Sequence, residues 1–217
     1  VIPVFHSNEP HTKGVIEKFI NNSNNGFKMS VSVSKQINSY INPQKGSTHF
    51  VIPCGTPLTD YRAKLDSDKL RIIYAGRIEI EQKQILLLAN AFIAASKLIP
   101  ELEFNIYGNG SQEQNTRKLI ESKKINNVNF RGAVAPSEIQ KIMSEHHIFT
   151  LMSDYEGMPV ALMEAMACGL VPICLKEESG INEIIKDGVN GFIVNNRGQD
   201  YQEKLRLLQK DPELWKH

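Results

Sequence analysis

The sequence predicts an α/β fold, with a parallel sheet flanked by helices and preceded by a smaller, incomplete α/β part. After about residue 70, short apolar runs alternate with helical patterns, which is typical of repeated βαβ units and a parallel sheet. A polar, charged stretch at residues 60–69 reads as a linker before this regular part. Polar and charged residues follow several strand-like runs, and ligands of parallel sheets bind outside the carboxyl ends of the strands.

The first part of the chain predicts three strands and two helices, with Ser34 as the cap of the second helix. The predicted strands are residues 1–5, 28–33 and 49–52, and the predicted helices are residues 14–20 and 34–41. This is too little for a full doubly wound domain. We therefore expect residues 1–65 to be the remnant of a larger α/β domain together with the linker.

The second part, residues 66–217, predicts a Rossmann-like domain. Its predicted strands are residues 70–74, 102–107, 128–130, 148–152, 171–174 and 192–194. Its predicted helices are residues 84–98, 112–123, 136–145, 159–167, 181–186 and 199–209.

Length and composition limit the function classes. The chain has 217 residues, a formal net charge of +1 and 41% hydrophobic residues, which suits one large domain or one domain with part of another. Near-neutral charge without basic blocks argues against nucleic acid as the partner. No apolar run approaches the ~20 residues that span a membrane. The cysteines Cys54, Cys168 and Cys174 lack metal-type spacing, which favours a reducing cytosol and buried thiols.

One stretch, residues 154–169, predicts a loop that runs into a helix. Gly157 gives the backbone freedom, Pro159 suits the first helical position, and Gly169 suits the position after the last turn. The N–H groups of Val160 and Ala161 then point out of the helix start. Together with the helix dipole they favour an anion, above all a phosphate.

Two carboxylates flank this helix start, Glu156 before it and Glu164 inside it. Carboxylates accept hydrogen bonds from hydroxyl groups, so the region combines an anion site with hydroxyl acceptors on both sides. A sugar nucleotide has a matching arrangement, with a diphosphate between ribose and hexose. A capped helix with two surface glutamates is the alternative interpretation of the same residues.

The spacing Glu156-x7-Glu164, within Glu-Gly-x-Pro and ahead of Ala-Met-Ala-x-Gly, resembles the donor-site motif of retaining glycosyltransferases of family 4, which have the GT-B fold. The resemblance covers nearly the whole chain. It implies transfer of a sugar from a nucleotide-diphosphate sugar to an acceptor with retention of anomeric configuration, in polysaccharide or glycoconjugate biosynthesis. It also implies a fragment of a larger enzyme, inactive alone, with a donor-binding domain at 66–217 and the end of the acceptor-side domain at 1–65.

A second motif, Gly76-Arg77-x5-Lys83, follows the strand predicted at residues 70–74. Arginine offers a fork and lysine a point charge for a diphosphate, whereas a solvated surface position is the ordinary place of both residue types. In the resembled family this pair neutralises the departing diphosphate. The family often has glycine after the lysine, and this chain has Gln84.

Three further positions come from the resemblance. Gly108, in Gly-Asn-Gly after the next strand, is expected to allow close backbone approach to the donor, although a plain turn explains it equally. Val134 stands where the family places the nucleobase against backbone groups. His6 directly follows the first predicted strand, where a histidine of the family faces the reacting sugar. A lone histidine is more often structural.

The resemblance assigns Glu156 to the anomeric carbon, as nucleophile or as electrostatic support, together with His6, and assigns Glu164 to the ribose hydroxyls. The residues that it implies for donor binding are Gly76, Arg77, Lys83, Gly108, Val134, Gly157, Met158, Val160, Ala161 and Glu164. Family members typically need no metal or other cofactor.

The implied partners are a nucleotide-sugar donor and a saccharide or lipid-linked acceptor, in the cytoplasm or at the inner face of the membrane. Two alternatives stay open: a sugar-nucleotide 2-epimerase of the same fold, and an inactive nucleotide-binding fragment. The sequence does not identify the base or the sugar of the donor.

Overall fold

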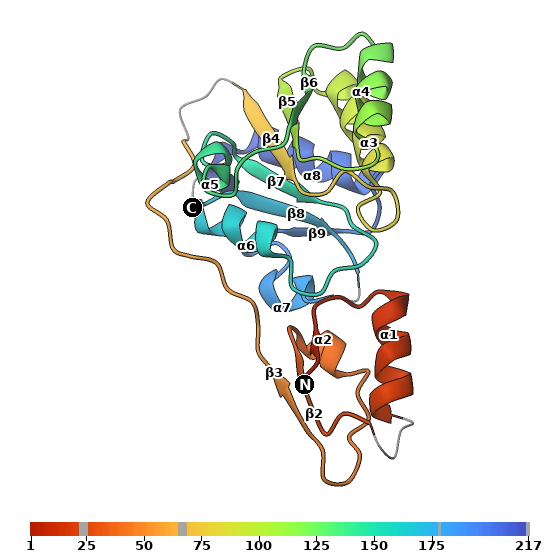
Figure 1. Cartoon of the computed structure of the whole chain (residues 1–217). Helices are drawn as coiled ribbons and strands as arrows, with labels where there is room; N and C mark the ends of the chain where they lie inside the picture. Colours follow the sequence, from red (N-terminus) through yellow and green to blue (C-terminus); the bar gives the residue numbers. More distant parts are fainter. Residues whose placement is uncertain (22–25, 65–68, 178, 216–217) are drawn as a thin grey trace. The chain divides into compact units, whose positions relative to one another are not determined.

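The computed structural model describes residues 1–21, 26–64, 69–177 and 179–215 (Figure 1). The chain forms two compact units, each with its own parallel sheet. The first unit consists of Val1–Gly55, Tyr155–Val160 and Glu177–Lys186, and the second consists of Thr56–Asp154, Ala161–Lys176 and Asp187–His217. Two short segments from the later part of the sequence thus belong to the first unit. The predicted division between residues 65 and 66 stays a prediction.

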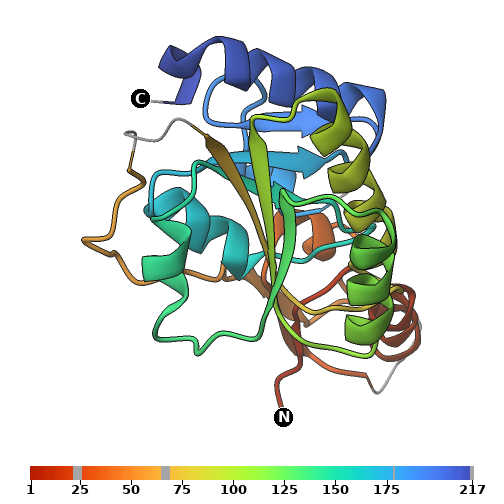
Figure 2. The ribbon, with the colours of Figure 1, turned by 90° about the horizontal axis from the view of Figure 1, so that it is seen from above.

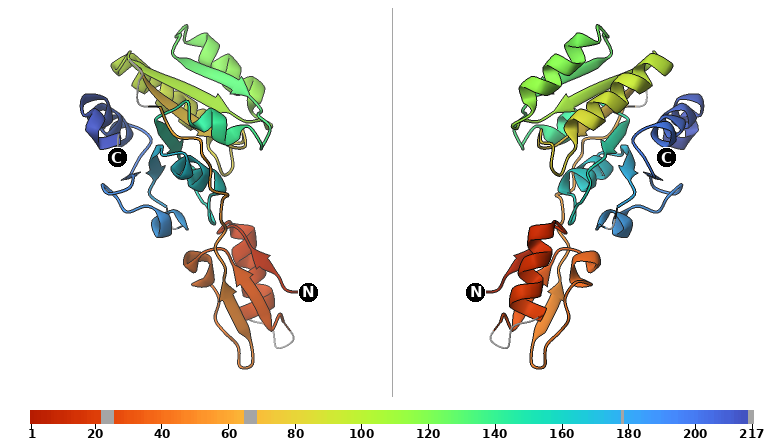
Figure 3. Two further views of the ribbon diagram at one scale, coloured as in Figure 1. Left: turned by 90° about the vertical axis from the view of Figure 1, so that its left-hand side faces the viewer. Right: turned by 90° about the vertical axis from the view of Figure 1, so that its right-hand side faces the viewer.

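The first unit contains the sheet β1-β2-β3, formed by Val4–Phe5, Met29–Ser32 and Thr48–Val51. Its helical elements are α1 (Pro10–Ile16), the π-helical turn η1 (Glu17–Asn21), α2 (Lys35–Asn38) and α7 (Ile181–Ile184). Figure 3 shows α1 alongside the strands of this sheet.

Two details of the first unit concern its helix starts. The first helix begins at Pro10, four residues before the predicted start at Gly14, because proline is favoured at a first helical turn. The Ser34 hydroxyl accepts the Ile37 N–H at 3.2 Å and caps α2, as predicted.

The second unit contains a six-stranded parallel sheet in the order β6-β5-β4-β7-β8-β9. The strands are β4 (Leu70–Ala75), β5 (Leu102–Tyr107), β6 (Val128–Gly132), β7 (Ile148–Leu151), β8 (Val171–Leu175) and β9 (Phe192–Val194). All six strands were predicted at these places. The order of the strands reverses between β4 and β7, so the loops after these strands diverge at that point, where ligands of such sheets bind.

Helices cover both faces of this sheet. They are α3 (Ile85–Leu98), α4 (Glu113–Ser122), α5 (Ile139–Met143), α6 (Val160–Ala167) and α8 (Gln199–Lys210), with a final 3₁₀ turn η2 (Pro212–Trp215). Figure 2 shows α3 and α4 on one side of the sheet and α5 and α6 on the other. The helix α5 is shorter than the predicted range 136–145. Within the described residues, no helix has both the length and the apolar character needed to cross a membrane.

The helix α6 begins at Val160, one residue after the predicted start, and ends as predicted. Gly169 has a φ of 81°, and its N–H donates to the Met166 carbonyl at 3.0 Å. The Leu170 N–H donates to the Ala165 carbonyl at 3.0 Å. These two bonds form the usual glycine-terminated helix end, which satisfies the last carbonyls of α6.

The apolar core of the second unit joins α3 and α8 to the same face of the sheet. The rings of Phe92 and Phe104 stack with centroids 4.6 Å apart, and the Tyr201 ring lies 6.3 Å from that of Phe92. The buried Tyr201 hydroxyl shares a hydrogen bond of 2.9 Å with Thr150. Burial raises the pKa of this phenol, so it stays neutral and satisfied inside the core.

Two buried histidines stand at the start of β7. His147 accepts the Arg71 N–H through Nδ1 at 2.9 Å and donates through Nε2 to the Lys64 carbonyl at 2.8 Å. His146 donates through Nδ1 to the Ile142 carbonyl at 2.8 Å and is only 3% exposed. Burial lowers the pKa of His146 from 6.5 to about 4, so the ring is neutral at pH 7.

We expect His146 to make the protein less stable in acid. Its pKa is lower in the folded than in the unfolded chain, so the unfolded chain binds more protons between pH 6.5 and 4, and stability is lost as the pH falls through this range. Denaturant unfolding at pH 7.5 and pH 5 is expected to differ by about 2 kcal/mol more in the wild type than in His146→Asn, whose amide can keep the bond to Ile142. An equal pH dependence of the two proteins would contradict this assignment.

Candidate active site

The loops at the carboxyl ends of β4, β5 and β6 are hydrogen-bonded to one another. The Gly76 N–H donates to the Tyr107 carbonyl at 3.1 Å, and the Gly108 N–H donates to the Gly132 carbonyl at 2.8 Å. Main-chain bonds of this kind fix the relative positions of three loops that are far apart in the sequence. These three loops carry several of the candidate donor-binding residues.

Gly108 makes this arrangement possible. Its φ is 141°, in the region that favours glycine, and a Cβ at this position would lie 1.8 Å from the Gly76 carbonyl oxygen. Gly110 is similar, with a φ of 156° and only 2.5 Å between a Cβ and the Ile78 carbonyl oxygen. This close approach joins one loop to another, and the approach of the backbone to the donor that the sequence suggested stays a prediction.

Above these loops lies a pocket of about 340 Å³, which we call the carboxyl-edge pocket. Small-molecule sites have volumes of about 300–1,000 Å³, so the pocket is large enough for part of a nucleotide. Six of the predicted donor-binding residues line it, and they come from the loops after β4, β5 and β6 and from the helix α6. These six residues are Gly76, Arg77, Gly108, Val134, Ala161 and Glu164.

The two charged side chains of the carboxyl-edge pocket differ in their surroundings. Arg77 is 61% exposed; its guanidinium pairs with Glu79 at 3.1 Å and donates to Gln82. Burial raises the pKa of Glu164, because the ionised carboxylate is less well hydrated there than in free solution. Among the described residues, no side chain donates a hydrogen bond to Glu164 in compensation. Hydroxyl donors of a ligand would supply that compensation.

Other predicted donor-binding residues lie outside the lining of this pocket. Lys83 stands in the turn before α3, next to Gln84, whose φ of 50° and ψ of 42° are left-handed. Val160 is the first residue of α6 and counts with the first unit, as does Met158. Their roles in donor binding stay predictions.

The first unit brings another group of predicted residues together. His6 follows β1, and a Cβ at Gly157 would lie 1.7 Å from the His6 carbonyl oxygen. The Gly180 N–H donates to the Gly157 carbonyl at 2.8 Å. The segment with Glu156 therefore belongs with the end of β1, although about 150 residues separate them in the sequence. This places the two candidate catalytic residues in the same unit.

Sequence reasoning missed Arg197, which follows β9. Its guanidinium donates to the Met152 carbonyl through Nε at 3.1 Å and through Nη2 at 2.7 Å, and it forms an ion pair with Asp154. Asp154 also accepts a hydrogen bond from the Gln84 amide. The only local signal for Arg197 was its place at the carboxyl end of a strand.

The described residues contain no group of three His, Cys, Asp or Glu side chains that could hold a metal ion. The sequence has an Asp-x-Asp triplet, Asp66-Ser67-Asp68, which lies outside the described residues.

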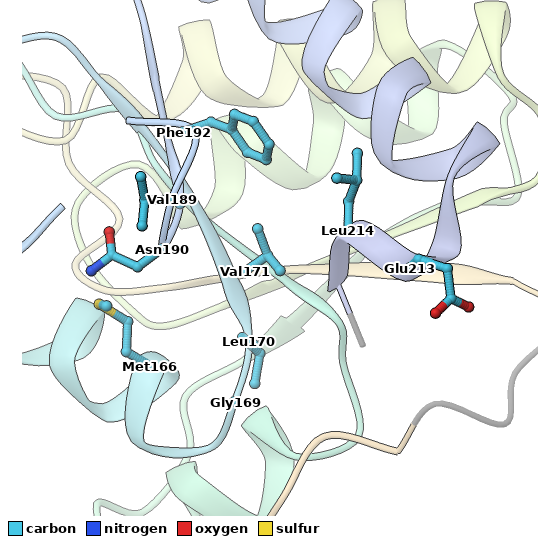
Figure 4. A pocket seen from close by; sticks show the side chains of 11 residues that line it. Met166, Gly169, Leu170, Val171, Val189, Asn190, Phe192, Glu213 and Leu214 are labelled. Carbon is cyan, nitrogen blue, oxygen red and sulfur yellow. The ribbon is translucent and has the colours of Figure 1, made fainter. Parts of the chain in front are cut away.

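A second hollow of about 450 Å³ lies at the amino ends of β8 and β9, at the opposite edge of the sheet; we call it the amino-edge hollow. Figure 4 shows the side chains of Val171, Phe192 and Leu214 around the same space. Glu213 is its one charged lining residue among the described residues. None of the predicted site residues lines this hollow, so the carboxyl-edge pocket is the better candidate for the functional site.

Comparison with protein families gives one match over most of the chain: a family model described as glycosyl transferases group 1 matches residues 59–217. Among curated proteins, the chain is 27% identical over 191 residues to the GtfA subunit of the UDP-N-acetylglucosamine–peptide N-acetylglucosaminyltransferase of Streptococcus agalactiae. The match covers 88% of this chain and 36% of that protein.

Solved structures show the same fold. The pneumococcal O-GlcNAc transferase GtfA, in complex with UDP and GlcNAc, matches with a TM-score of 0.81 and 23% identity, over 97% of this chain and 46% of that one. Anabaena Alr3699/HepE, in complex with UDP and glucose, matches with a TM-score of 0.76 and 18% identity, over 98% of this chain and 63% of that one. The chain spans about half the length of these proteins.

We expect Gly108→Ala to destabilise the second unit by at least about 2 kcal/mol, because the new methyl group meets a carbonyl oxygen and the backbone conformation is unfavourable for alanine. Gly188→Ala is the matched control, since its φ is 71° but nothing lies within 4 Å of the added Cβ. The control is expected to lose about 1 kcal/mol. Equal losses in denaturant unfolding would contradict a collision at position 108.

Proposed function

Because the chain belongs to the glycosyl transferases group 1 family and has the fold of GT-B glycosyltransferases, we propose that the protein transfers a sugar from a nucleotide-diphosphate sugar to an acceptor with retention of anomeric configuration. The carboxyl-edge pocket is the donor site. The observation that carries this proposal is that the loops after β4, β5 and β6, together with α5 and α6, bring a guanidinium, a partly buried carboxylate and several apolar side chains into one pocket.

The apolar corner and Glu164 suit a nucleoside. Val134, Pro136 and Ile139 line one part of the pocket and offer an apolar surface to a flat base. Glu164 lines the same pocket. Its carboxylate accepts hydrogen bonds that the two ribose hydroxyls donate. Binding of these hydroxyls offsets the desolvation that raises the pKa of the carboxyl group.

Arg77 and Lys83 suit the diphosphate. The Arg77 guanidinium is largely exposed and its pairing with Glu79 is a surface ion pair, so exchange of this partner for a phosphate costs little. Ala161 lines the pocket in the first turn of α6, where the helix dipole favours an anion. These charges contribute most as negative charge develops on the departing nucleotide.

The transfer step uses Glu156 and His6, which belong to the first unit. A carboxylate near the anomeric carbon stabilises the positive charge that develops there or forms a covalent bond to it, and both roles are compatible with retention. Residues 1–65 are the end of the acceptor-side domain and residues 66–217 the donor-binding domain of a larger enzyme. The reaction requires no metal ion or other cofactor.

Among possible donors we favour a UDP-sugar. The curated relative is a UDP-N-acetylglucosamine transferase, and the two matched crystal structures contain UDP with GlcNAc or glucose. The acceptor is a saccharide or a lipid-linked saccharide of polysaccharide or glycoconjugate biosynthesis, in the cytoplasm or at the inner face of the membrane.

Glu164→Gln tests the donor site. We expect the variant to bind UDP about tenfold more weakly in calorimetry, because the neutral amide loses the charge-assisted bonds to the ribose. Glu213→Gln, which changes the charged residue of the amino-edge hollow, serves as the matched control and is expected to bind like the wild type. Equal affinities of wild type and Glu164→Gln would contradict the proposed role of Glu164.

The reaction itself is tested with the full-length protein, incubated with UDP-, GDP- and ADP-sugars in the presence and absence of candidate saccharide acceptors. We expect a UDP-sugar to be consumed only with an acceptor, and NMR of the product to show the anomeric configuration of the donor. Change of the sugar without an acceptor would indicate the epimerase instead. Binding of a nucleotide without any turnover would indicate a protein that only binds nucleotides.

A further inference from the structure

The turn before α3 has an unusual backbone conformation. Gln84 is left-handed, with φ 50° and ψ 42°, and α3 starts directly after it at Ile85. Residues with a Cβ atom rarely adopt this conformation, because the Cβ approaches the following carbonyl oxygen. Left-handed residues of this kind persist where surrounding interactions hold them. Lys83 immediately precedes Gln84, so the conformation of residue 84 decides where the Lys83 side chain starts.

The interactions that hold this turn come from other loops. The Gln84 side-chain amide donates to Oδ2 of Asp154, and the Asp154 N–H donates to the Gln82 carbonyl at 2.9 Å. Asp154 is therefore hydrogen-bonded to both sequence neighbours of Lys83, Gln82 and Gln84. Asp154 follows β7, whereas the turn belongs to the loop after β4, the neighbouring strand.

Arg197 in its own right fixes the Asp154 carboxylate. It forms an ion pair with Oδ1 of Asp154 and donates twice to the Met152 carbonyl, at 3.1 and 2.7 Å. The Arg197 side chain is 20% exposed and that of Asp154 is 38% exposed, so water screens this pair only in part. We call these three residues, Gln84, Asp154 and Arg197, the Asp154 network. It connects the loops after β4, β7 and β9.

We propose that Asp154 and Arg197 are positioning residues: they hold Gln84 in the left-handed turn and thereby place Lys83 for the phosphates of the donor. The proposal rests on the proposed function, since it takes Lys83 as a phosphate-binding residue. Asp154 and Arg197 themselves touch no substrate. Their effect on the donor passes through the backbone of residue 84.

This mechanism makes the role of Asp154 depend on the residue at position 84. Glycine has no Cβ and adopts left-handed conformations without strain, so it does not need Asp154 to hold it. Loss of Asp154 should therefore harm a protein with glutamine at this position and should harm a protein with glycine there much less. A residue that acts in another way, for example directly on the donor, would not show this dependence.

The test compares wild type, D154A, Q84G and the double variant D154A/Q84G in the full-length protein, with UDP as the probe. We expect D154A to bind UDP about tenfold more weakly than the wild type in calorimetry. We expect D154A/Q84G to bind UDP within about threefold of Q84G. The measured quantity is the loss of UDP affinity that D154A causes with glutamine at position 84, divided by the loss that it causes with glycine there.

Glu103→Ala is the matched control. Glu103 on β5 also accepts from one arginine and one side-chain amide, Arg131 at 3.4 Å and Asn105 at 3.1 Å, but it lies in the first half of its strand. Loss of this carboxylate is expected to leave UDP binding unchanged. A tenfold loss in E103A as well would show a general effect of destabilisation and would overturn the proposal.

Hydrogen exchange of two amides gives a readout that needs no nucleotide. The Gln84 N–H donates to the Ile80 carbonyl at 3.0 Å and the Ile85 N–H donates to the Glu79 carbonyl at 3.1 Å. We expect both amides to exchange faster in D154A and to regain their protection in D154A/Q84G. Equal weakening of UDP binding by D154A with either residue at position 84, or unchanged exchange in D154A, would overturn the proposal.

The two proposals fail in different ways. If wild type binds neither UDP, GDP nor ADP, the proposed function is wrong and with it the placing of Lys83 for a donor. If the amides of residues 84 and 85 still exchange faster in D154A and regain protection in D154A/Q84G, the part of the proposal that concerns the turn is supported. If wild type binds UDP but D154A is not rescued by Q84G, only the role of the Asp154 network is wrong.

Discussion

The candidate donor site depends on one constraint, the hydrogen bonding of the loops after β4, β5 and β6 to one another. Glycines at positions 76, 108 and 132 take part in these bonds, and a side chain at position 108 would collide with a carbonyl oxygen. The bonds leave little freedom to the three loops. Arg77 and Val134 stand on two of these loops, so their backbones are held relative to each other before any ligand arrives, and such preorganisation lowers the cost of binding.

The residues of the proposed reaction are divided between the two units. The residues that line the carboxyl-edge pocket belong to the second unit, whereas Gly157, Met158 and Val160, which the sequence also predicts for donor binding, belong to the first. Glu156 and His6 belong to the first unit, where Gly157 brings their backbones together. The proposed transfer thus draws on residues of both units, and along the chain the segment 155–160 leads directly into the helix α6. This division explains why one helix start carries two kinds of functional residue.

Much of the fold followed from the sequence, because strands of a covered parallel sheet are continuous apolar runs and each was bounded by turn residues. The helix end at Gly169 followed from glycine's preference for left-handed conformations. The left-handed Gln84, the reach of Arg197 to Met152 and the membership of residues 155–160 in the first unit did not follow. Each depends on contacts between segments far apart in the chain, for which the local pattern carries no signal.

The central claim is that the nucleotide binds at the carboxyl edge of the sheet. A titration with UDP, followed by NMR of the backbone amides, tests it most directly. One experiment then records the amides of both the carboxyl-edge pocket and the amino-edge hollow. We expect the amide signals of Gly76, Gly108 and Ala161 to shift, while those of Val189 and Leu214 in the amino-edge hollow stay in place. Shifts confined to the amino-edge hollow would contradict the account.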